Sequence, residues 1–115
     1  MTARGGVGVP RGTPLPVLVD EQAVREFCVN NEVGELALFG SVLRADFRAD
    51  SDVDILIRFQ PGKRVSLIDL CRMEAVLAPL VGGRMVDLRT AGDLHPRIRQ
   101  QVLTEREVLY DAAAR

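Results

Sequence analysis

The side chains best suited to chemistry lie between Gly40 and Asp54, a stretch that reads GSVLRADFRADSDVD. Asp52 and Asp54 stand two residues apart at the start of an apolar run. Residues two apart on a β-strand point to the same face, so these carboxylates would lie close together. Two like charges so placed are unfavourable unless a cation lies between them or one carboxylate takes up a proton. The spacing therefore predicts a metal site.

Gly40 and Ser41 indicate what such a metal would act on. They follow the apolar run 36–39, where we expect a strand to end and a short helix, over about 42–47, to begin with Ser41 as its cap. Free backbone N–H groups at a helix start favour a phosphate. Carboxylates beside a phosphate select Mg²⁺, which binds one or two carboxylates together with substrate phosphate oxygens. The pattern indicates metal-assisted chemistry on a nucleotide phosphate.

A third carboxylate, Asp87, lies in the apolar segment 85–89 and alternates there with Val86 and Leu88. If this segment is a strand beside that of Asp54, all three carboxylates can share one site. In two-metal sites one ion activates the attacking oxygen and the other stabilises the leaving group. Asp87 would then either complete the site of the activating metal or accept the proton of the attacking hydroxyl.

Strands and helices that hold these residues are expected from hydrophobic periodicity. Short apolar or alternating runs predict strands at 36–39, 53–59, 85–89 and, as a short edge strand, 108–110. Apolar residues three or four apart, with capping residues before them, predict helices at 21–30 after Asp20, from 67 to Leu77 or Ala78 after Ser66, and from Pro96 onward. Along 53–59 the two-residue alternation directs Val53, Ile55 and Ile57 into the core and Asp54 to the other face. The expected class is α/β (α+β), with three or four strands.

Length and composition are those of one globular domain, with 115 residues, 47% hydrophobic and 27% charged. Residues 1–16 are rich in glycine and proline and are expected to form a flexible arm before a domain at 17–115. The net charge of −1 disfavours a nucleic-acid partner. No apolar stretch is long enough for a membrane span, so a cytoplasmic protein is expected. Cys28 and Cys71 lack metal-site spacing, and both are predicted to be buried thiols.

The string GSxxRxDxxxxSDxD before an apolar strand resembles the minimal nucleotidyltransferases (MNT) of the DNA polymerase beta superfamily. The matching residues are Gly40, Ser41, Arg44, Asp46, Ser51, Asp52 and Asp54, and the later Asp87 fits the family's third carboxylate. The resemblance spans about residues 20–110. It implies a small mixed β-sheet flanked by helices, the nucleotidyltransferase fold.

The same resemblance implies that Asp52, Asp54 and Asp87 are catalytic and hold two Mg²⁺ ions, with ATP as the substrate. The nucleotide would bind at Gly40, Ser41, Arg44 and Ser51. Arg44 would either clamp phosphate oxygens or pair with Asp46. Ser51 is better suited to closing the turn and orienting the aspartates than to chemistry.

Small stand-alone members of this family are similar to the antitoxins of HEPN/MNT toxin–antitoxin pairs, some of which transfer AMP from ATP to a tyrosine of the toxin. The likeness implies a HEPN toxin encoded nearby as partner, in a hetero-oligomer. Two alternatives remain: an antitoxin that covers the toxin without catalysis, and an enzyme that modifies a small molecule such as an aminoglycoside. A pure binder has no physical need of three aspartates and a Gly-Ser turn, so the sequence favours an enzyme and leaves the acceptor open.

Overall fold

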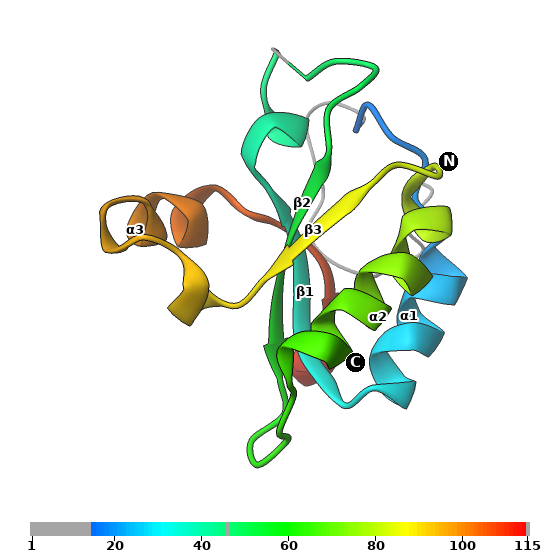
Figure 1. Ribbon diagram of the computed structural model, residues 1–115, viewed down its shortest axis with the longest axis vertical. Coiled ribbons are helices and arrows are strands. Elements are labelled where there is room, and N and C mark those ends of the chain that lie inside the picture. Colours follow the sequence, from blue (N-terminus) through cyan, green and yellow to red (C-terminus); the bar gives the residue numbers. More distant parts are fainter. Residues whose placement is uncertain (1–14, 46, 115) are drawn as a thin grey trace.

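The computed structural model describes residues 15–45 and 47–114 (Figure 1). Most of the predicted N-terminal arm and Asp46 therefore lie outside the described residues. Of the arm's last two residues, Leu15 packs against the core. None of the helices within the described part of the chain is both long and apolar enough to cross a membrane.

Four strands form a single sheet in the order β3-β2-β1-β4. Their bounds are Val33–Phe39 for β1, Val53–Phe59 for β2, Val86–Arg89 for β3 and Glu107–Asp111 for β4. β1 runs antiparallel to both β2 and β4, whereas β2 and β3 are parallel, so the sheet is mixed as predicted. β1 begins earlier than the apolar run suggests because buried Val33 still pairs with the end of β2.

Three helices flank the sheet: α1 (Glu21–Asn30), α2 (Leu67–Leu77) and α3 (Pro96–Glu105). The caps predicted at Asp20 and Ser66 are confirmed. Asp20 accepts a hydrogen bond from the backbone N–H of Ala23, and Ser66 forms a capping box with Asp69. α2 gives way after Leu77 to the 3-10 turn η2 (Ala78–Val81), which contains Pro79.

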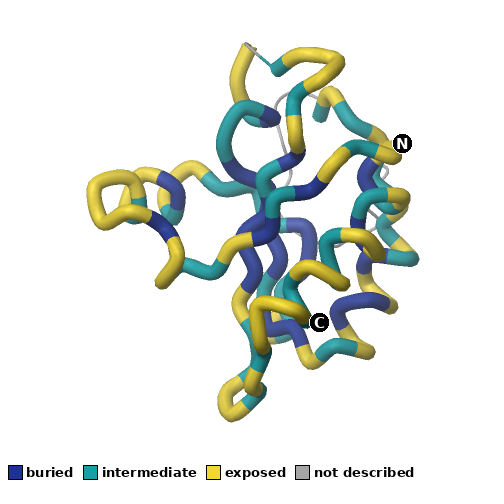
Figure 2. Tube along the Cα trace, viewed as in Figure 1, coloured by how far each residue is buried: buried dark blue, intermediate teal, exposed yellow. Residues whose placement is uncertain are grey.

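The strands at the centre of the molecule are largely buried (Figure 2). The two faces of β2 pack into different clusters of side chains. Val53, Ile55 and Ile57 are almost fully buried and belong to the main core, where α1 and α2 cover the sheet. Leu56 points the other way and packs with Phe39, Leu94 and Val102 in a second cluster that includes α3. The start of β2, with Asp52 exposed and Asp54 half-buried, remains open to solvent.

The turn after β1 differs from the short helix expected over 42–47. It is the 3-10 turn η1 (Gly40–Leu43), and Arg44 after it is already extended. Because Gly40 takes a positive φ of 77° directly after β1, the turn begins at Gly40, two residues earlier than expected. Ser41 therefore lies inside the turn and does not cap it.

The two cysteines differ in exposure, so the expectation that both are buried is wrong for Cys71. Cys28 is fully buried in α1, and that burial raises its pKa to about 12. Cys71 is exposed on α2 because the core-facing stripe of that helix passes through Met73 and Leu77 instead.

Alkylation of the native protein with iodoacetamide at pH 8 is expected to modify Cys71 and to leave Cys28 intact, because the thiolate is the reactive form. Intact-mass spectrometry should show a single adduct in the native protein and a second one only in denaturant. A Cys71→Ser variant should acquire none under native conditions. Rapid native labelling of that variant would show that α1 does not bury Cys28.

Candidate active site

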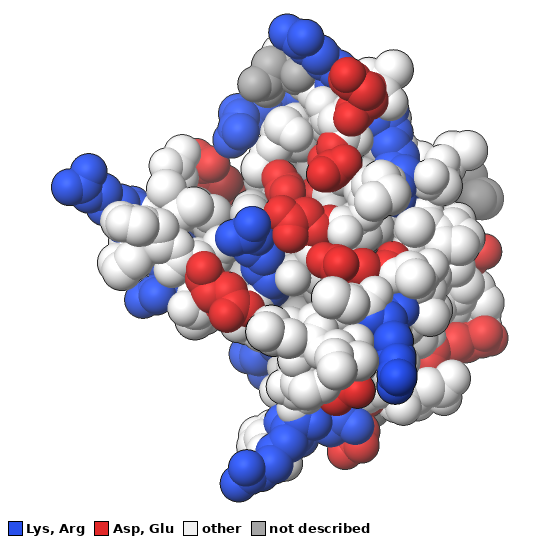
Figure 3. Space-filling view, viewed as in Figure 1, with Lys and Arg blue, Asp and Glu red and all other residues white. Residues whose placement is uncertain are grey.

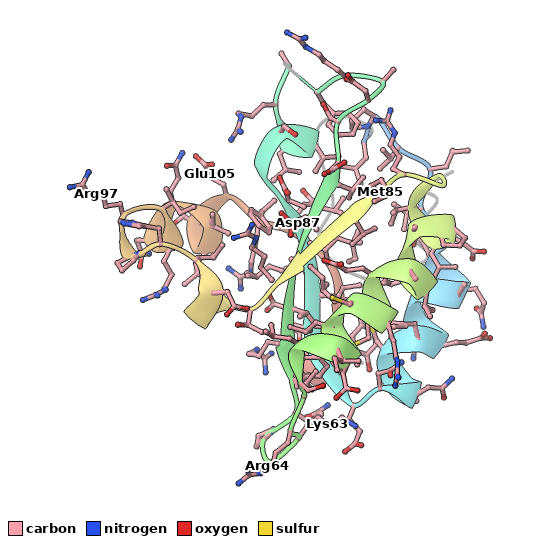
Figure 4. All side chains as sticks on the ribbon, in the orientation of Figure 1. Lys63, Arg64, Met85, Asp87, Arg97 and Glu105 are labelled. Atoms are coloured by element: carbon pink, nitrogen blue, oxygen red, sulfur yellow. The ribbon has the colours of Figure 1, made fainter. Side chains whose placement is uncertain are left out.

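The parallel pairing of β2 and β3 brings the predicted carboxylates together. In its register Asp54 is the direct partner of Asp87, and Val53 is the partner of Val86. The condition for Asp87 to share the site, that its strand lies beside that of Asp54, is therefore met. Figure 4 shows Asp87 at the centre of the molecule, and Figure 3 shows acidic side chains gathered over this region. Asp52 immediately precedes β2 and is exposed.

Asp54 is the electrostatic centre of the site. Burial raises its pKa, and the negative charges of Asp87 and Asp52 raise it further, while Arg89 and Arg44 lower it. Asp54 therefore experiences the charges of both other predicted carboxylates and of the predicted phosphate-binding arginine. Such a group of like charges favours a bound cation.

Arg89 is a charged residue of this site that the sequence analysis did not single out. Its Nη2 lies 3.3 Å from Oδ2 of Asp87, and its Nε donates to both carboxylate oxygens at 3.3 Å. The sequence pattern that could have identified Arg89 is its position two residues after Asp87, which places both side chains on one face of β3. Arg89 therefore partly neutralises Asp87 in this structure.

Gly40 stands where a side chain would strain the backbone and crowd Asp54. Its φ of +77° is rarely adopted by residues with a side chain, and a Cβ built there would lie 2.3 Å from Oδ2 of Asp54. The pairing of Phe39 with Asp54 across β1 and β2 causes this close approach. The Gly-Ser turn is thus in contact with the central carboxylate, and Ser41 lies half-buried within it.

Ser51 closes the turn that leads into Asp52. Its Oγ accepts a hydrogen bond from the Arg48 N–H at 2.9 Å, and its own N–H donates to the Arg48 carbonyl at 3.1 Å. These bonds match the structural role expected for Ser51. Arg44 is exposed after η1, and its possible partner Asp46 lies outside the described residues.

Whether these residues suit Mg²⁺ is decided by their donor chemistry. Within residues 15–45 and 47–114, no group of three or more His, Cys, Asp or Glu side chains is arranged to hold a metal ion. Mg²⁺ does not require one, because it usually takes one or two carboxylates and completes its shell with water and substrate phosphates. Asp54, flanked by Asp52 and Asp87, offers hard oxygen donors only. The residues therefore fit a magnesium ion that binds together with a phosphate substrate.

Comparison with known proteins assigns the chain to a family. Residues 21–109 match the nucleotidyltransferase domain family. The protein adenylyltransferase MntA of Thermococcus cleftensis is 41% identical over 78 residues, which cover 68% of this chain and 74% of that protein. The chain belongs to the nucleotidyltransferase domain family, and it is a nucleotidyltransferase. The family resemblance found in the sequence is confirmed.

Solved structures show the same fold. A candidate minimal nucleotidyltransferase is 37% identical with a TM-score of 0.60, and the match covers 75% of this chain and 85% of that one. A chain from the complex of a tri-AMPylated Shewanella oneidensis HEPN toxin with an MNT antitoxin has a TM-score of 0.58 at 22% identity, covering 82% and 71%. The predicted nucleotidyltransferase fold is therefore confirmed.

Replacement of Gly40 by alanine tests the contact between the Gly-Ser turn and Asp54. Gly62→Ala is the matched control, because Gly62 also has a positive φ but a Cβ there meets nothing within 4 Å. The control should lose about 1 to 2 kcal/mol of unfolding free energy through its backbone conformation alone. Gly40→Ala should lose about 1 to 3 kcal/mol more, because Asp54 must move.

Denaturant unfolding measures both losses, and nucleotidyl transfer should fall in Gly40→Ala alone. Equal destabilisation of the two variants, with activity kept in both, would contradict the close packing of Gly40 against Asp54.

Proposed function

We propose that this nucleotidyltransferase is a Mg²⁺-dependent protein adenylyltransferase that transfers AMP from ATP to a tyrosine hydroxyl of a partner HEPN toxin, and thereby acts as its antitoxin. The observation that carries the proposal is the pairing of Asp54 with Asp87, with Gly40 against the Asp54 carboxylate. In this proposal Asp52, Asp54 and Asp87 are the catalytic and metal-binding residues.

The nucleotide would bind with its triphosphate at the turn after β1. Gly40 brings the backbone of the Gly-Ser turn close to Asp54, and Arg44, exposed just after the turn, would clamp phosphate oxygens. Ser51 keeps the adjoining turn closed. Two Mg²⁺ ions, when bound, would neutralise the phosphate charge and make the acceptor hydroxyl easier to deprotonate.

In the transfer step the acceptor oxygen forms a bond to the α-phosphorus while the bond from that phosphorus to the bridging oxygen breaks. Pyrophosphate leaves with that electron pair. The proton of the acceptor hydroxyl passes to Asp87 or, if Asp87 serves only as a ligand, to solvent. The place of Asp87 beside Asp54 suits either role.

Support for a protein acceptor comes from the relatives and from the openness of the site. The Thermococcus cleftensis relative carries the name protein adenylyltransferase, and the Shewanella oneidensis complex contains a tri-AMPylated HEPN toxin with an MNT antitoxin. Asp52 is exposed, and β3 is an edge strand. A bulky acceptor can therefore approach the carboxylates from solvent, in a hetero-oligomer with the toxin.

Incubation with labelled ATP, Mg²⁺ and the product of the adjacent gene tests the proposal. The wild-type protein should label the partner, and the double variant Asp52→Asn, Asp54→Asn should label it at least about a hundredfold more slowly, as should protein with EDTA. Asp50→Asn is the matched control, because Asp50 is an exposed aspartate beside the site with no assigned role.

The label is then mapped by peptide mass spectrometry, and a tyrosine is the expected residue. Absence of labelling by the wild-type protein, or equal labelling by the double variant, would refute catalysis. If the double variant still neutralised the partner in cells, the protein would be an antitoxin that acts by binding alone.

A further inference from the structure

Arg84 connects the two segments that carry the carboxylates. It precedes β3, and its Nη1 donates to the backbone carbonyl of Arg48 at 2.7 Å and to that of Ser51 at 3.1 Å. Its guanidinium carbon also lies 4.5 Å from the centroid of the Phe47 ring. Arg84 therefore contacts the turn over residues 47–51 at three points, which are the carbonyls of Arg48 and Ser51 and the ring of Phe47.

The contact with Ser51 bears directly on Asp52. The Ser51 carbonyl belongs to the planar peptide group that joins Ser51 to Asp52. The hydrogen bond from Arg84 therefore fixes the orientation of that peptide group. Along its own segment, Arg84 lies three residues before Asp87. In between, the Met85 carbonyl accepts a hydrogen bond from Val53 at 2.8 Å. A single side chain thus spans the turn before β2 and the entry to β3.

A guanidinium suits this position better than an ammonium group. One of its nitrogens supplies both hydrogen bonds, and its flat face lies over an aromatic ring at the same time. Lysine could keep the charge, but it has neither the planar group nor the fixed fork of donors. The bonds between Arg48 and Ser51 close the turn internally, whereas Arg84 joins that turn to the β3 side.

We propose that Arg84 is a positioning residue for the transfer reaction. It holds the turn at 47–51 so that Asp52 stays aligned with Asp54 and Asp87, and it acts through the turn's carbonyls without touching the nucleotide. This inference rests on the proposed function for its effect on catalysis. Its structural part concerns the turn alone and is measurable without any substrate.

The test compares Arg84→Gln and Arg84→Lys with Arg64→Gln as the matched control. Arg64 is exposed beyond the end of β2, away from Asp87 (Figure 4). Hydrogen–deuterium exchange of peptides covering 47–52 reports the turn, and electron paramagnetic resonance of added Mn²⁺ reports the carboxylates. In Arg84→Gln, exchange in this segment should accelerate, Mn²⁺ affinity should fall about tenfold, and kcat should fall by a similar factor.

Arg84→Lys should recover part of each loss, and Arg64→Gln should behave as the wild type. Phe47→Leu keeps the two hydrogen bonds and removes the ring, so it should accelerate exchange in the same segment by a smaller factor. This second variant tests the contact even if Arg84→Gln does not fold.

Unchanged exchange at 47–52 in both Arg84→Gln and Phe47→Leu would overturn the proposal. So would a loss of transfer in Arg84→Gln with wild-type exchange and wild-type Mn²⁺ affinity, because Arg84 would then act on the substrate directly. If the wild-type protein transfers no AMP, the proposed function fails, and the exchange and Mn²⁺ measurements still decide the role of Arg84.

Discussion

The site depends on one costly arrangement, the side-by-side placement of Asp54 and Asp87 in the parallel register of β2 and β3. Burial and the neighbouring charge of Asp87 raise the pKa of Asp54, so its charged form is disfavoured there. Burial of apolar side chains from the same two strands offsets that cost. Val53 and Ile55 are fully buried, and Val86 and Leu88 nearly so. The buried apolar side chains of β2 and β3 thus hold the two strands together against the repulsion between Asp54 and Asp87.

Surrounding elements hold this pair of strands from both sides. At the end of β1, the glycine turn leaves room for the Asp54 carboxylate only because Gly40 has no Cβ. On the outer edge, the Glu74 carboxylate of α2 accepts a hydrogen bond at 2.8 Å from the backbone N–H of Leu88, the residue after Asp87. That bond satisfies an N–H group on an edge strand. Three segments therefore surround the Asp54 carboxylate: η1, the turn before β2, and β3.

Much of this arrangement was predictable because it follows local rules. The alternation along residues 53–59 gave the bounds of β2, and the polar residues Asp20 and Ser66 marked the starts of two helices. Contacts between segments distant in the sequence could not be predicted from those local rules. Periodicity placed Arg89 on the face of Asp87 but did not indicate an ion pair, and no local pattern linked Arg84 to a turn more than thirty residues away. The helix expected after Ser41 was shortened because the backbone of Gly40 had already turned.

In the proposed function, the three carboxylates and the Gly-Ser turn bind a divalent cation and a nucleotide together. Calorimetric titration of ATP into the protein, with Mg²⁺ and again with EDTA, tests it most directly. We expect saturable ATP binding with Mg²⁺, a large loss of affinity in EDTA, and the same loss with Mg²⁺ when Asp54 is replaced by asparagine. ATP binding of equal affinity with and without Mg²⁺, unaffected by the Asp54 substitution, would contradict it.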